Sequence, residues 1–343
     1  MIRLEGLSRV YSTPRGQVAA VDDVTLEVGE GETCVLLGPS GCGKTTTLRM
    51  INRLVRPTSG KIFIAGRDTD GVDPVALRRG IGYVIQQIGL FPNMTVAENI
   101  GVVPRLLGWN AAKSRRRAEE LLALLALEPS QFLERYPNEL SGGQAQRVGV
   151  ARALAVDPPL LLMDEPFAAL DPINREAIQD EFLRMQKTLR KTILFVSHDI
   201  DEAVKMADRI AIFRAGKVAQ FGPPDELLAR PADEFVASFV GRDRTLKRLR
   251  LIYVREVMTP LTDGAGAGGP SVSPDDDLRR VATLFLEHDV ETIVCVDDTG
   301  RVVGQVSRGA VAARLGMEAI ECPRQWRRAA RRCPTSCWER SLW

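Results

Sequence analysis

A glycine-rich segment separates an unbroken apolar run from a stretch with helical character. Residues 38–46 read GPSGCGKTT and fit the pattern G-x-x-x-x-G-K-[ST]. The apolar run Thr33–Leu37 before it is typical of a strand buried in a parallel sheet. Glycines at these positions let backbone N–H groups and a helix start face negative charge. The segment predicts a phosphate-binding loop; the alternative is a glycine-rich turn with an exposed lysine.

Two side chains of this loop supply the groups that a nucleoside triphosphate needs. Lys44 would reach the β- and γ-phosphates, and the Thr45 hydroxyl would ligate Mg²⁺. We therefore expect ATP and Mg²⁺ as the ligands. The other loop residues that we expect around the phosphates are Gly38, Pro39, Ser40, Gly41, Cys42, Gly43 and Thr46.

A second apolar run, residues 160–163, ends in two carboxylates, Asp164 and Glu165. A strand that ends in acidic residues is common by chance, but this one lies downstream of a phosphate-binding loop. Asp164 is placed to hold the Mg²⁺ shell, and Glu165 to act as the general base that orients the attacking water. We predict that Lys44 and Glu165 act in catalysis and that Asp164 takes part in metal binding.

Residues 140–144 read LSGGQ and precede another helical segment. A serine N-cap followed by two glycines makes a second anion-binding helix start, although a plain capped helix is the alternative. One nucleotide has a single γ-phosphate, which Lys44 already covers. We therefore predict that this second cradle closes over a nucleotide held by another copy of the chain. Its residues are Ser141, Gly142, Gly143 and Gln144.

Short apolar runs alternate with helical segments through the first 240 residues. Strands are predicted at 2–7, 19–28, 33–37, 160–163 and 192–196, and helices at 44–54, 111–127, 141–155 and 199–207. This alternation predicts an α/β fold with a mostly parallel sheet. Residues 241–253 are predicted to be a linker. A βαβ-like unit is predicted over 278–305, with strands at 293–296 and 302–306.

Composition and the chain start indicate the cellular setting. The 343 residues include 46 basic and 44 acidic side chains, a net charge of +2, which argues against a nucleic-acid scaffold held by bulk charge. No apolar run approaches the ~18 residues of a membrane-spanning helix, and the N-terminus lacks a secretory pattern. The six cysteines show no zinc spacing. These features predict a reducing, cytoplasmic setting.

Together these motifs resemble the nucleotide-binding subunits of ATP-binding-cassette (ABC) transporters. The resemblance covers residues 1–240 and also rests on Gln86, the sequence ALD at 169–171 and His198. It implies a P-loop ABC ATPase domain with a mostly parallel sheet core, an N-terminal antiparallel β part and a helical subdomain. It also implies a head-to-tail homodimer with two ATP molecules, each between one loop and the partner's residues 140–144.

The resemblance assigns roles that the motifs alone do not. Tyr11 would stack on adenine, and Gln86 would contact Mg²⁺ and sense the membrane partner. Asp171 would lie in the loop that communicates across the dimer, and His198 would contact the γ-phosphate during catalysis. Without the resemblance, Tyr11 is simply an exposed tyrosine, and His198 is a helix cap or a satisfied polar group.

Two stretches, RMINRL at 49–54 and IGYVIQQIGLFPNMTV at 81–96, resemble importers of quaternary-ammonium osmoprotectants such as glycine betaine, choline and carnitine. This implies an ATPase that powers uptake at the cytoplasmic face of the bacterial inner membrane. Its partners would be integral membrane permease subunits and, indirectly, an extracytoplasmic solute-binding protein, with no nucleic acid. An apolar patch would receive a short permease helix, unless its residues are core. The patch comprises Ile88, Leu90, Phe91 and Met94.

Residues 254–316 resemble one cystathionine-β-synthase-type (CBS) repeat. They contain VMTP at 257–260, a predicted helix at 275–286 and the sequence TIVCVDD at 292–298. Such repeats normally occur in pairs and act as regulatory sensors in several osmoprotectant importers. Only one copy can be traced, because the Arg-, Trp- and Cys-rich residues 317–343 resemble no second repeat. We expect this tail to be disordered and regulation to be altered or lost.

Three alternative functions follow from the same residues. A soluble ABC ATPase acting on DNA or ribosomes is disfavoured, because the segment between Lys44 and Ser141 is too short for a long coiled coil and one ATPase domain is seen. A nucleotide sensor without hydrolysis is disfavoured by Glu165 and His198. Among importers, the solute would alternatively be methionine, taurine or another small molecule.

Overall fold

A computed structural model describes residues 1–14, 16–86, 89–168, 170–261 and 269–315, with the backbone alone for 172–174. The chain forms two compact units, Met1–Lys247 and Arg248–Trp343. The disorder that we expect of residues 317–343 concerns a segment outside the described residues.

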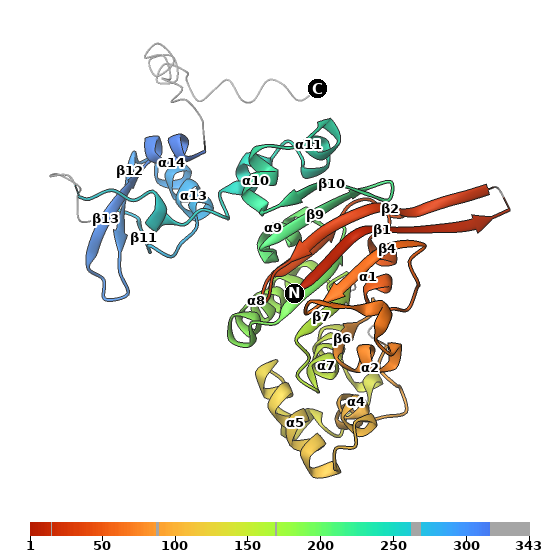
Figure 1. Cartoon of the computed structure of the whole chain (residues 1–343). Helices are drawn as coiled ribbons and strands as arrows, with labels where there is room; N and C mark the ends of the chain where they lie inside the picture. Colours follow the sequence, from red (N-terminus) through yellow and green to blue (C-terminus); the bar gives the residue numbers. More distant parts are fainter. Residues whose placement is uncertain (15, 87–88, 169, 262–268, 316–343) are drawn as a thin grey trace, which may run out of the picture. The chain divides into compact units, whose positions relative to one another are not determined.

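Two sheets build the first unit (Figure 1). Its strands are β1 (Ile2–Thr13), β2 (Gly16–Val28), β3 (Thr33–Leu37), β4 (Ser59–Ile64), β5 (Arg67–Asp68), β6 (Ile81–Val84), β7 (Leu160–Asp164), β8 (Thr192–Ser197), β9 (Arg209–Arg214) and β10 (Lys217–Gly222). The larger sheet has the order β10-β9-β3-β8-β7-β6, and its pairs are parallel except for the β9–β10 hairpin. The smaller, antiparallel sheet has the order β2-β1-β4-β5.

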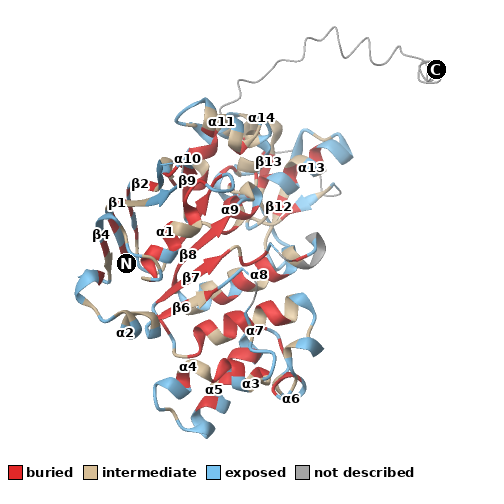
Figure 2. Ribbon diagram, turned by 90° about the vertical axis from the view of Figure 1, so that its right-hand side faces the viewer, coloured by how far each residue is buried: buried red, intermediate tan, exposed pale blue. Residues whose placement is uncertain are grey.

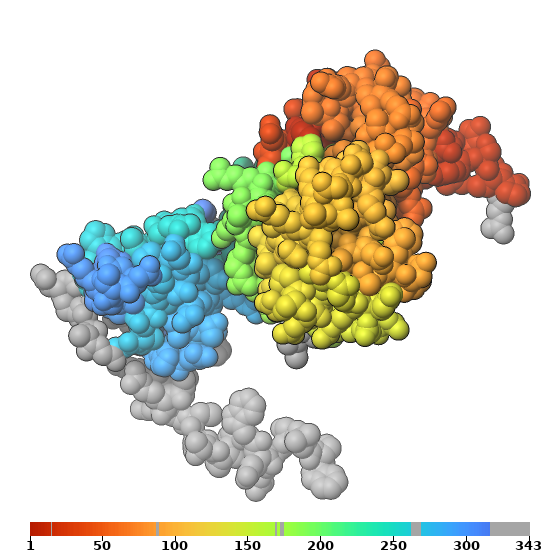
Figure 3. Space-filling view, turned by 90° about the horizontal axis from the view of Figure 1, so that it is seen from below, coloured from red at the N-terminus to blue at the C-terminus, as the bar shows by residue number. Residues whose placement is uncertain are grey.

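Helices flank the larger sheet and also form a layer of their own, which contributes the yellow surface in Figure 3. The α-helices of the first unit are α1 (Lys44–Ile51), α2 (Pro74–Arg79), α3 (Val96–Ile100), α4 (Val102–Leu106), α5 (Ala111–Leu124), α6 (Pro129–Phe132), α7 (Gly142–Leu154), α8 (Pro172–Leu189), α9 (Ile200–Met206), α10 (Pro224–Ala229), α11 (Glu234–Val240) and α12 (Arg244–Arg248). In the helical layer, α3 and α5 pack against α7, which also contacts β6. The predicted α/β fold with a mostly parallel sheet is confirmed.

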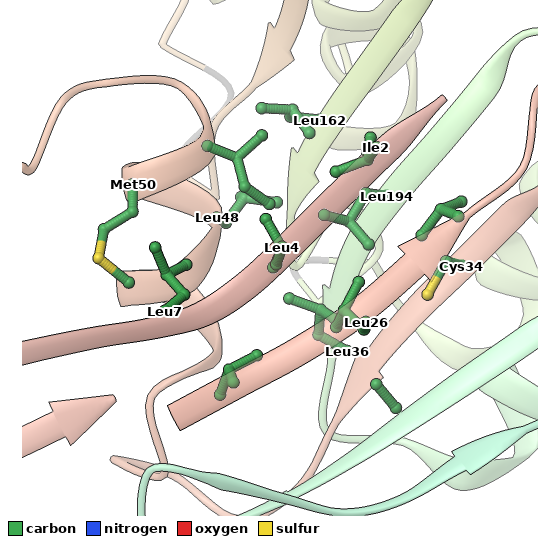
Figure 4. Packing of buried hydrophobic residues seen from close by; sticks show 14 of the residues in the cluster. Ile2, Leu4, Leu7, Leu26, Cys34, Leu36, Leu48, Met50, Leu162 and Leu194 are labelled. Atoms are coloured by element: carbon green, nitrogen blue, oxygen red, sulfur yellow. The ribbon is translucent and has the colours of Figure 1, made fainter. Parts of the chain in front are cut away.

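The core of the first unit lies around α1, between the two sheets. Leu48 and Met50 of α1 share a buried cluster with Leu4 of β1, Leu36 of β3 and Leu162 of β7 (Figure 4). Every residue of β3, β7 and β8 is buried, and Figure 2 shows these strands as continuous buried ribbons. Parallel strands covered on both faces require continuous apolar runs, which is why their sequence predicted them.

Two predicted boundaries are wrong, each for a local reason. The first strand, predicted to end at residue 7, continues to Thr13, and the second, predicted to begin at residue 19, begins at Gly16. The two strands pair with each other there as an antiparallel ribbon beyond the buried part of the sheet. That ribbon is held by backbone hydrogen bonds and carries little apolar signal. The helix predicted to reach Leu54 ends at Ile51, where Asn52 caps it and Arg53 adopts a positive φ of 48°.

The second unit contains β11 (Ser271–Val272), α13 (Leu278–His288), β12 (Thr292–Val296), β13 (Val302–Ser307) and α14 (Arg308–Arg314). The parallel unit is β11-α13-β12, whereas β12 and β13 form an antiparallel hairpin. The predicted βαβ-like unit over 278–305 was therefore wrong in pairing, because β11 is only two residues long and gives no periodic signal. The predicted linker contributes Leu249 and Ile252 to the buried core of this unit.

Candidate functional site

The glycine-rich loop connects β3 to α1 and surrounds an open cavity of about 210 Å³. Gly43 ends the loop with a φ of 106°, and a Cβ there would collide with the backbone oxygen of Ala20. Only glycine fits this combination of left-handed backbone and close approach. The cavity is lined by Ala20, Ser40, Gly41, Cys42, Gly43, Lys44, Thr45, Thr46 and Glu165. The predicted loop residues from Ser40 to Thr46 thus share one cavity with the predicted base.

The ammonium of Lys44 lies inside the loop. It donates to the backbone oxygens of Gly38 at 2.6 Å and Pro39 at 2.9 Å, and it lies 3.7 Å from the Cys42 sulfur. The lysine is 5% exposed. A buried cation held by backbone carbonyls at the base of the cavity is suited to meet an anionic ligand, because the loop already positions the charge.

Thr45 and Asp164 meet where β7 ends beside α1. The Thr45 hydroxyl donates to Asp164 Oδ1 at 2.9 Å, and burial raises the pKa of the Asp164 carboxyl. Hydroxyl and carboxylate oxygens are the hard donors that Mg²⁺ prefers. In the part of the chain that the structure describes, no cluster of three His, Cys, Asp or Glu side chains could hold a metal. This donor set fits a cation that is held mainly by phosphate oxygens and water, as Mg²⁺ often is.

Glu165 lies where the carboxyl ends of three adjacent strands meet. Its Oε2 accepts a hydrogen bond from Gln86 Nε2 at 3.0 Å and lies 3.5 Å from His198 Nδ1. Gln86 follows β6, Glu165 follows β7 and His198 follows β8, which are adjacent strands of one parallel sheet. Carboxyl ends of parallel strands form the usual ligand-binding edge of such a sheet. The structure therefore brings together three residues that lie far apart in the sequence.

The backbone of Glu165 is also constrained. Its φ is 46°, which is unusual for a residue other than glycine, and its N–H donates to the Val196 oxygen at 3.1 Å. Left-handed backbone at such a residue persists only where the surroundings hold it, and it clusters at functional sites. The side chain is 22% exposed, so the carboxylate is reachable.

The second cradle is preformed but faces a different cavity. Ser141 and Gln144 form a reciprocal capping box at the start of α7, with bonds of 3.3 and 2.9 Å. A Cβ at Gly143 would lie only 2.9 Å from Ile178 of α8, so the two helices approach closely there. Residues 141–144 line a concavity of about 520 Å³ together with Leu170 and Asp171. This lining shares no residue with the phosphate-loop cavity.

The remaining predicted residues lie apart from these two cavities. Tyr11 is 36% exposed on β1, with the Arg9 guanidinium 4.5 Å above its ring, and it lines neither cavity. Phe91 is 43% exposed, Leu90 and Met94 are half-buried, and Ile88 lies outside the described residues, as does Ala169 of the ALD sequence.

Sequence reasoning missed the residue that holds the segment after Gln86. The fully buried Asn99 of α3 accepts from Phe91 N–H at 2.8 Å and donates to the backbone oxygens of Phe91, Met94 and Thr95. A polar residue at a buried helix position was the available signal, since such a side chain needs partners.

Comparisons with known proteins agree with this geometry. Residues 21–168 match the model of the ABC transporter family, and residues 254–316 match the CBS domain. The chain is 58% identical, over 90% of its length and 79% of the relative, to the osmoprotectant import ATP-binding protein OsmV of Salmonella typhimurium. It belongs to the ABC transporter ATP-binding proteins. This ABC ATPase is also 51% identical, over 89% of its length and 78% of the relative, to a glycine betaine/carnitine/choline transport ATP-binding protein of Bacillus subtilis.

A solved structure described as the dimeric post-hydrolysis state of an ATP-binding cassette, bound to ADP and Pi, covers 65% of the ABC ATPase. It has a TM-score of 0.59 and 36% identity, and 98% of that chain is covered. The predicted family, its nucleotide-binding fold and the CBS segment are thereby confirmed. Among the helices that the structure describes in this ABC ATPase, none has the length and apolar character to cross a bilayer.

Proposed function

We propose that this chain is the ATP-hydrolysing subunit of an importer for quaternary-ammonium osmoprotectants. It works as a homodimer on permease subunits at the cytoplasmic face of the inner membrane. The observation that carries the proposal is the placement of Gln86 and His198 on Glu165 beside the phosphate-loop cavity. The substrate class is supported by relatives named for import of osmoprotectants, glycine betaine, carnitine and choline.

The loop residues bind and orient the triphosphate. Lys44 exchanges its contacts with the oxygens of Gly38 and Pro39 for phosphate oxygens, and the start of α1 adds backbone donors. Thr45, Asp164 and Gln86 are the residues that would hold Mg²⁺, which when bound neutralises charge on the β- and γ-phosphates.

Glu165 acts as the general base for the attacking water. The Gln86 amide fixes one carboxylate oxygen, and His198 lies beside the same oxygen, so the other oxygen remains to accept a proton. His198, with a side chain 59% exposed, is free to turn toward the γ-phosphate. This arrangement predicts that Glu165 governs the rate of hydrolysis and contributes little to the affinity for ATP.

Each complete site needs two chains. The phosphate-loop cavity and the concavity at residues 141–144 have separate linings. One chain therefore supplies one half of each of two different ATP sites. A head-to-tail dimer places each cradle over the partner's nucleotide and Asp171 beside the junction. In this dimer Tyr11 would stack on adenine.

The partners follow from the same surfaces. Leu90, Phe91 and Met94 form a partly exposed apolar patch after Gln86, which we propose as the seat of a permease helix. The solute-binding protein is an indirect, extracytoplasmic partner. We propose ATPase chemistry within residues 1–240, with regulation altered or lost because the CBS segment at 254–316 is a single repeat.

A single substitution separates the dimeric site from a site within one chain. Ser141→Arg places a bulky cation in the second cradle, outside the phosphate-loop cavity. We expect the full chain to keep its ATP affinity and to lose steady-state hydrolysis. Ser130→Arg, at an exposed serine of α6 that lines neither cavity, is the matched control. Hydrolysis by Ser141→Arg at the wild-type rate would disprove the shared site.

The solute class is tested in vesicles that contain the chain with its permease and solute-binding protein. ATP-dependent uptake of choline or glycine betaine is expected. Uptake of methionine or taurine instead, with ATP hydrolysis intact, would move the assignment to another importer class.

A further inference from the structure

The direction of the His198 ring depends on the turn between β8 and α9. The imidazole is 59% exposed, and its Nδ1 lies 3.5 Å from Glu165 Oε2. His198 stands between Ser197, the last residue of β8, and Asp199, the N-cap of α9. A ring that is largely exposed takes its direction mainly from the backbone that carries it. The groups that fix residues 197–199 therefore decide where the imidazole points.

One hydroxyl joins the residues on both sides of His198. Ser197 Oγ accepts from the Asp199 N–H at 3.0 Å, and the same hydroxyl is hydrogen-bonded to the Glu202 carboxyl. A second acceptor within reach of the hydroxyl is the backbone oxygen of Asp199, but at 3.5 Å that bond is marginal. The carboxyl of Glu202 therefore decides which way the hydroxyl points.

Glu202 holds this turn at two points and is itself held in place. Its N–H donates to Asp199 Oδ1 at 3.3 Å, and its Oε1 accepts from Gln179 Nε2 of α8 at 3.0 Å. Gln179, Ser197 and Glu202 are all more than nine-tenths buried. Burial raises the pKa of the Glu202 carboxyl, and the hydrogen bonds from Ser197 and Gln179 lower it. A polar network that is buried and hydrogen-bonded restricts the groups that take part in it.

We propose that Glu202 is a positioning residue for His198. Through the Ser197 hydroxyl it fixes the turn that carries the imidazole, so that the ring stands beside Glu165 and within reach of the γ-phosphate. Glu202, Glu165 and His198 line one small pocket, but Glu202 does not line the phosphate-loop cavity. A Glu202 with a structural role alone would stabilise the fold and leave the ring unaffected. This inference rests on the proposed ATPase.

Two substitutions break the network at different points in the full chain. Ser197→Ala removes the hydroxyl, and Glu202→Met removes the carboxyl but keeps an unbranched side chain. Each should lower kcat for ATP hydrolysis by up to about 10²-fold, which is what a displacement of about 1 Å near the reacting atoms can cost. The KM for ATP should stay nearly unchanged. Thr192→Val is the matched control, because it removes another buried hydroxyl of β8, one that accepts from Gly31 N–H.

A second measurement follows the ring itself. The chain contains two histidines, His198 and His288, so isotope labelling at histidine Cε1 gives one NMR signal for each. His288 belongs to α13 in the second unit, and His288→Gln assigns the two signals. Ser197→Ala and Glu202→Met should shift or broaden the His198 signal and leave the His288 signal unchanged. Thr192→Val should leave both signals as they are in the wild type.

The possible outcomes are distinguishable. A folded Ser197→Ala with the wild-type kcat overturns the inference, even if Glu202→Met does not fold. A lower melting temperature with an unchanged His198 signal also overturns it, because the network would then serve stability alone. Hydrolysis by His198→Ala at the wild-type rate removes the role that Glu202 is proposed to support and leaves the ATPase assignment intact. A wild-type chain that does not hydrolyse ATP refutes the proposed function itself.

Discussion

Replacing Glu165 by glutamine isolates proton acceptance from every other property of the site. Glutamine has nearly the same shape and retains one oxygen, which can still accept the 3.0 Å bond from Gln86. The contacts of the phosphate loop, including those of Lys44 and Thr45, do not involve Glu165. The substitution therefore removes a base and one negative charge and leaves the phosphate loop in place.

The expected magnitude follows from the role. Loss of a positioned general base lowers the rate by about 10²–10⁴-fold, which corresponds to about 2.7–5.4 kcal/mol in the barrier. ATP affinity should stay the same or rise, because one negative charge near the phosphates has been removed. The variant should consequently accumulate as an ATP-bound dimer.

Three measurements on the full chain test this reasoning. Phosphate release gives the steady-state rate, equilibrium dialysis gives the ATP affinity, and light scattering with and without ATP gives the oligomeric state. Glu176→Gln, at an exposed carboxylate of α8, removes the same charge outside the site and should behave as wild type. Hydrolysis by Glu165→Gln at the wild-type rate refutes the role as base. A parallel loss of ATP binding would make Glu165 a binding residue instead.

Two further predictions concern groups around the site. Burial raises the pKa of the Glu202 carboxyl. The stabilisation by protonated Glu202 is full below the unfolded pKa and is lost as the pH rises through the folded pKa. The melting temperature of Glu202→Gln minus that of wild type should therefore increase as the pH rises through this titration, and a constant difference contradicts the prediction. Phe91→Glu should weaken co-purification with the permease subunits without changing ATP binding, because it places a charge in an apolar contact. Leu106→Glu, at another exposed apolar residue in the helical layer, is its control, and equal retention of the permease by both variants argues against the patch.

The sequence predicted those parts of the fold whose signal is local. Thr33–Leu37 and the glycines after it predict a buried strand, a loop and a helix within a few residues. The structure has this strand, loop and helix at the predicted positions. The outer part of the β1–β2 ribbon was missed because backbone pairing, and not an apolar pattern, makes it a hairpin, and β11 was missed because it has two residues and pairs with the distant β12. The existence of β11 therefore depends on a tertiary contact that no short window of sequence contains.

The candidate site divides in the same way. Motif spacing predicted that Lys44, Thr45 and Asp164 surround a phosphate, and the structure places the Thr45 hydroxyl 2.9 Å from Asp164 Oδ1. It did not supply the order of β6, β7 and β8 that places Gln86 and His198 on one carboxylate. Asn99 was missed because polar side chains on helices are usually solvated, and only the folded chain shows its backbone acceptors.

The separate linings of the two cavities constrain how copies of this chain associate. If the cradle at residues 141–144 meets the partner's phosphate loop, a twofold axis makes the reciprocal contact at the same time. Association then completes two sites together, and a lone complete site would need an asymmetric pair. Asp171 lines the same concavity as residues 141–144, so the same reciprocal contact would bring both copies of Asp171 to the junctions between the two chains.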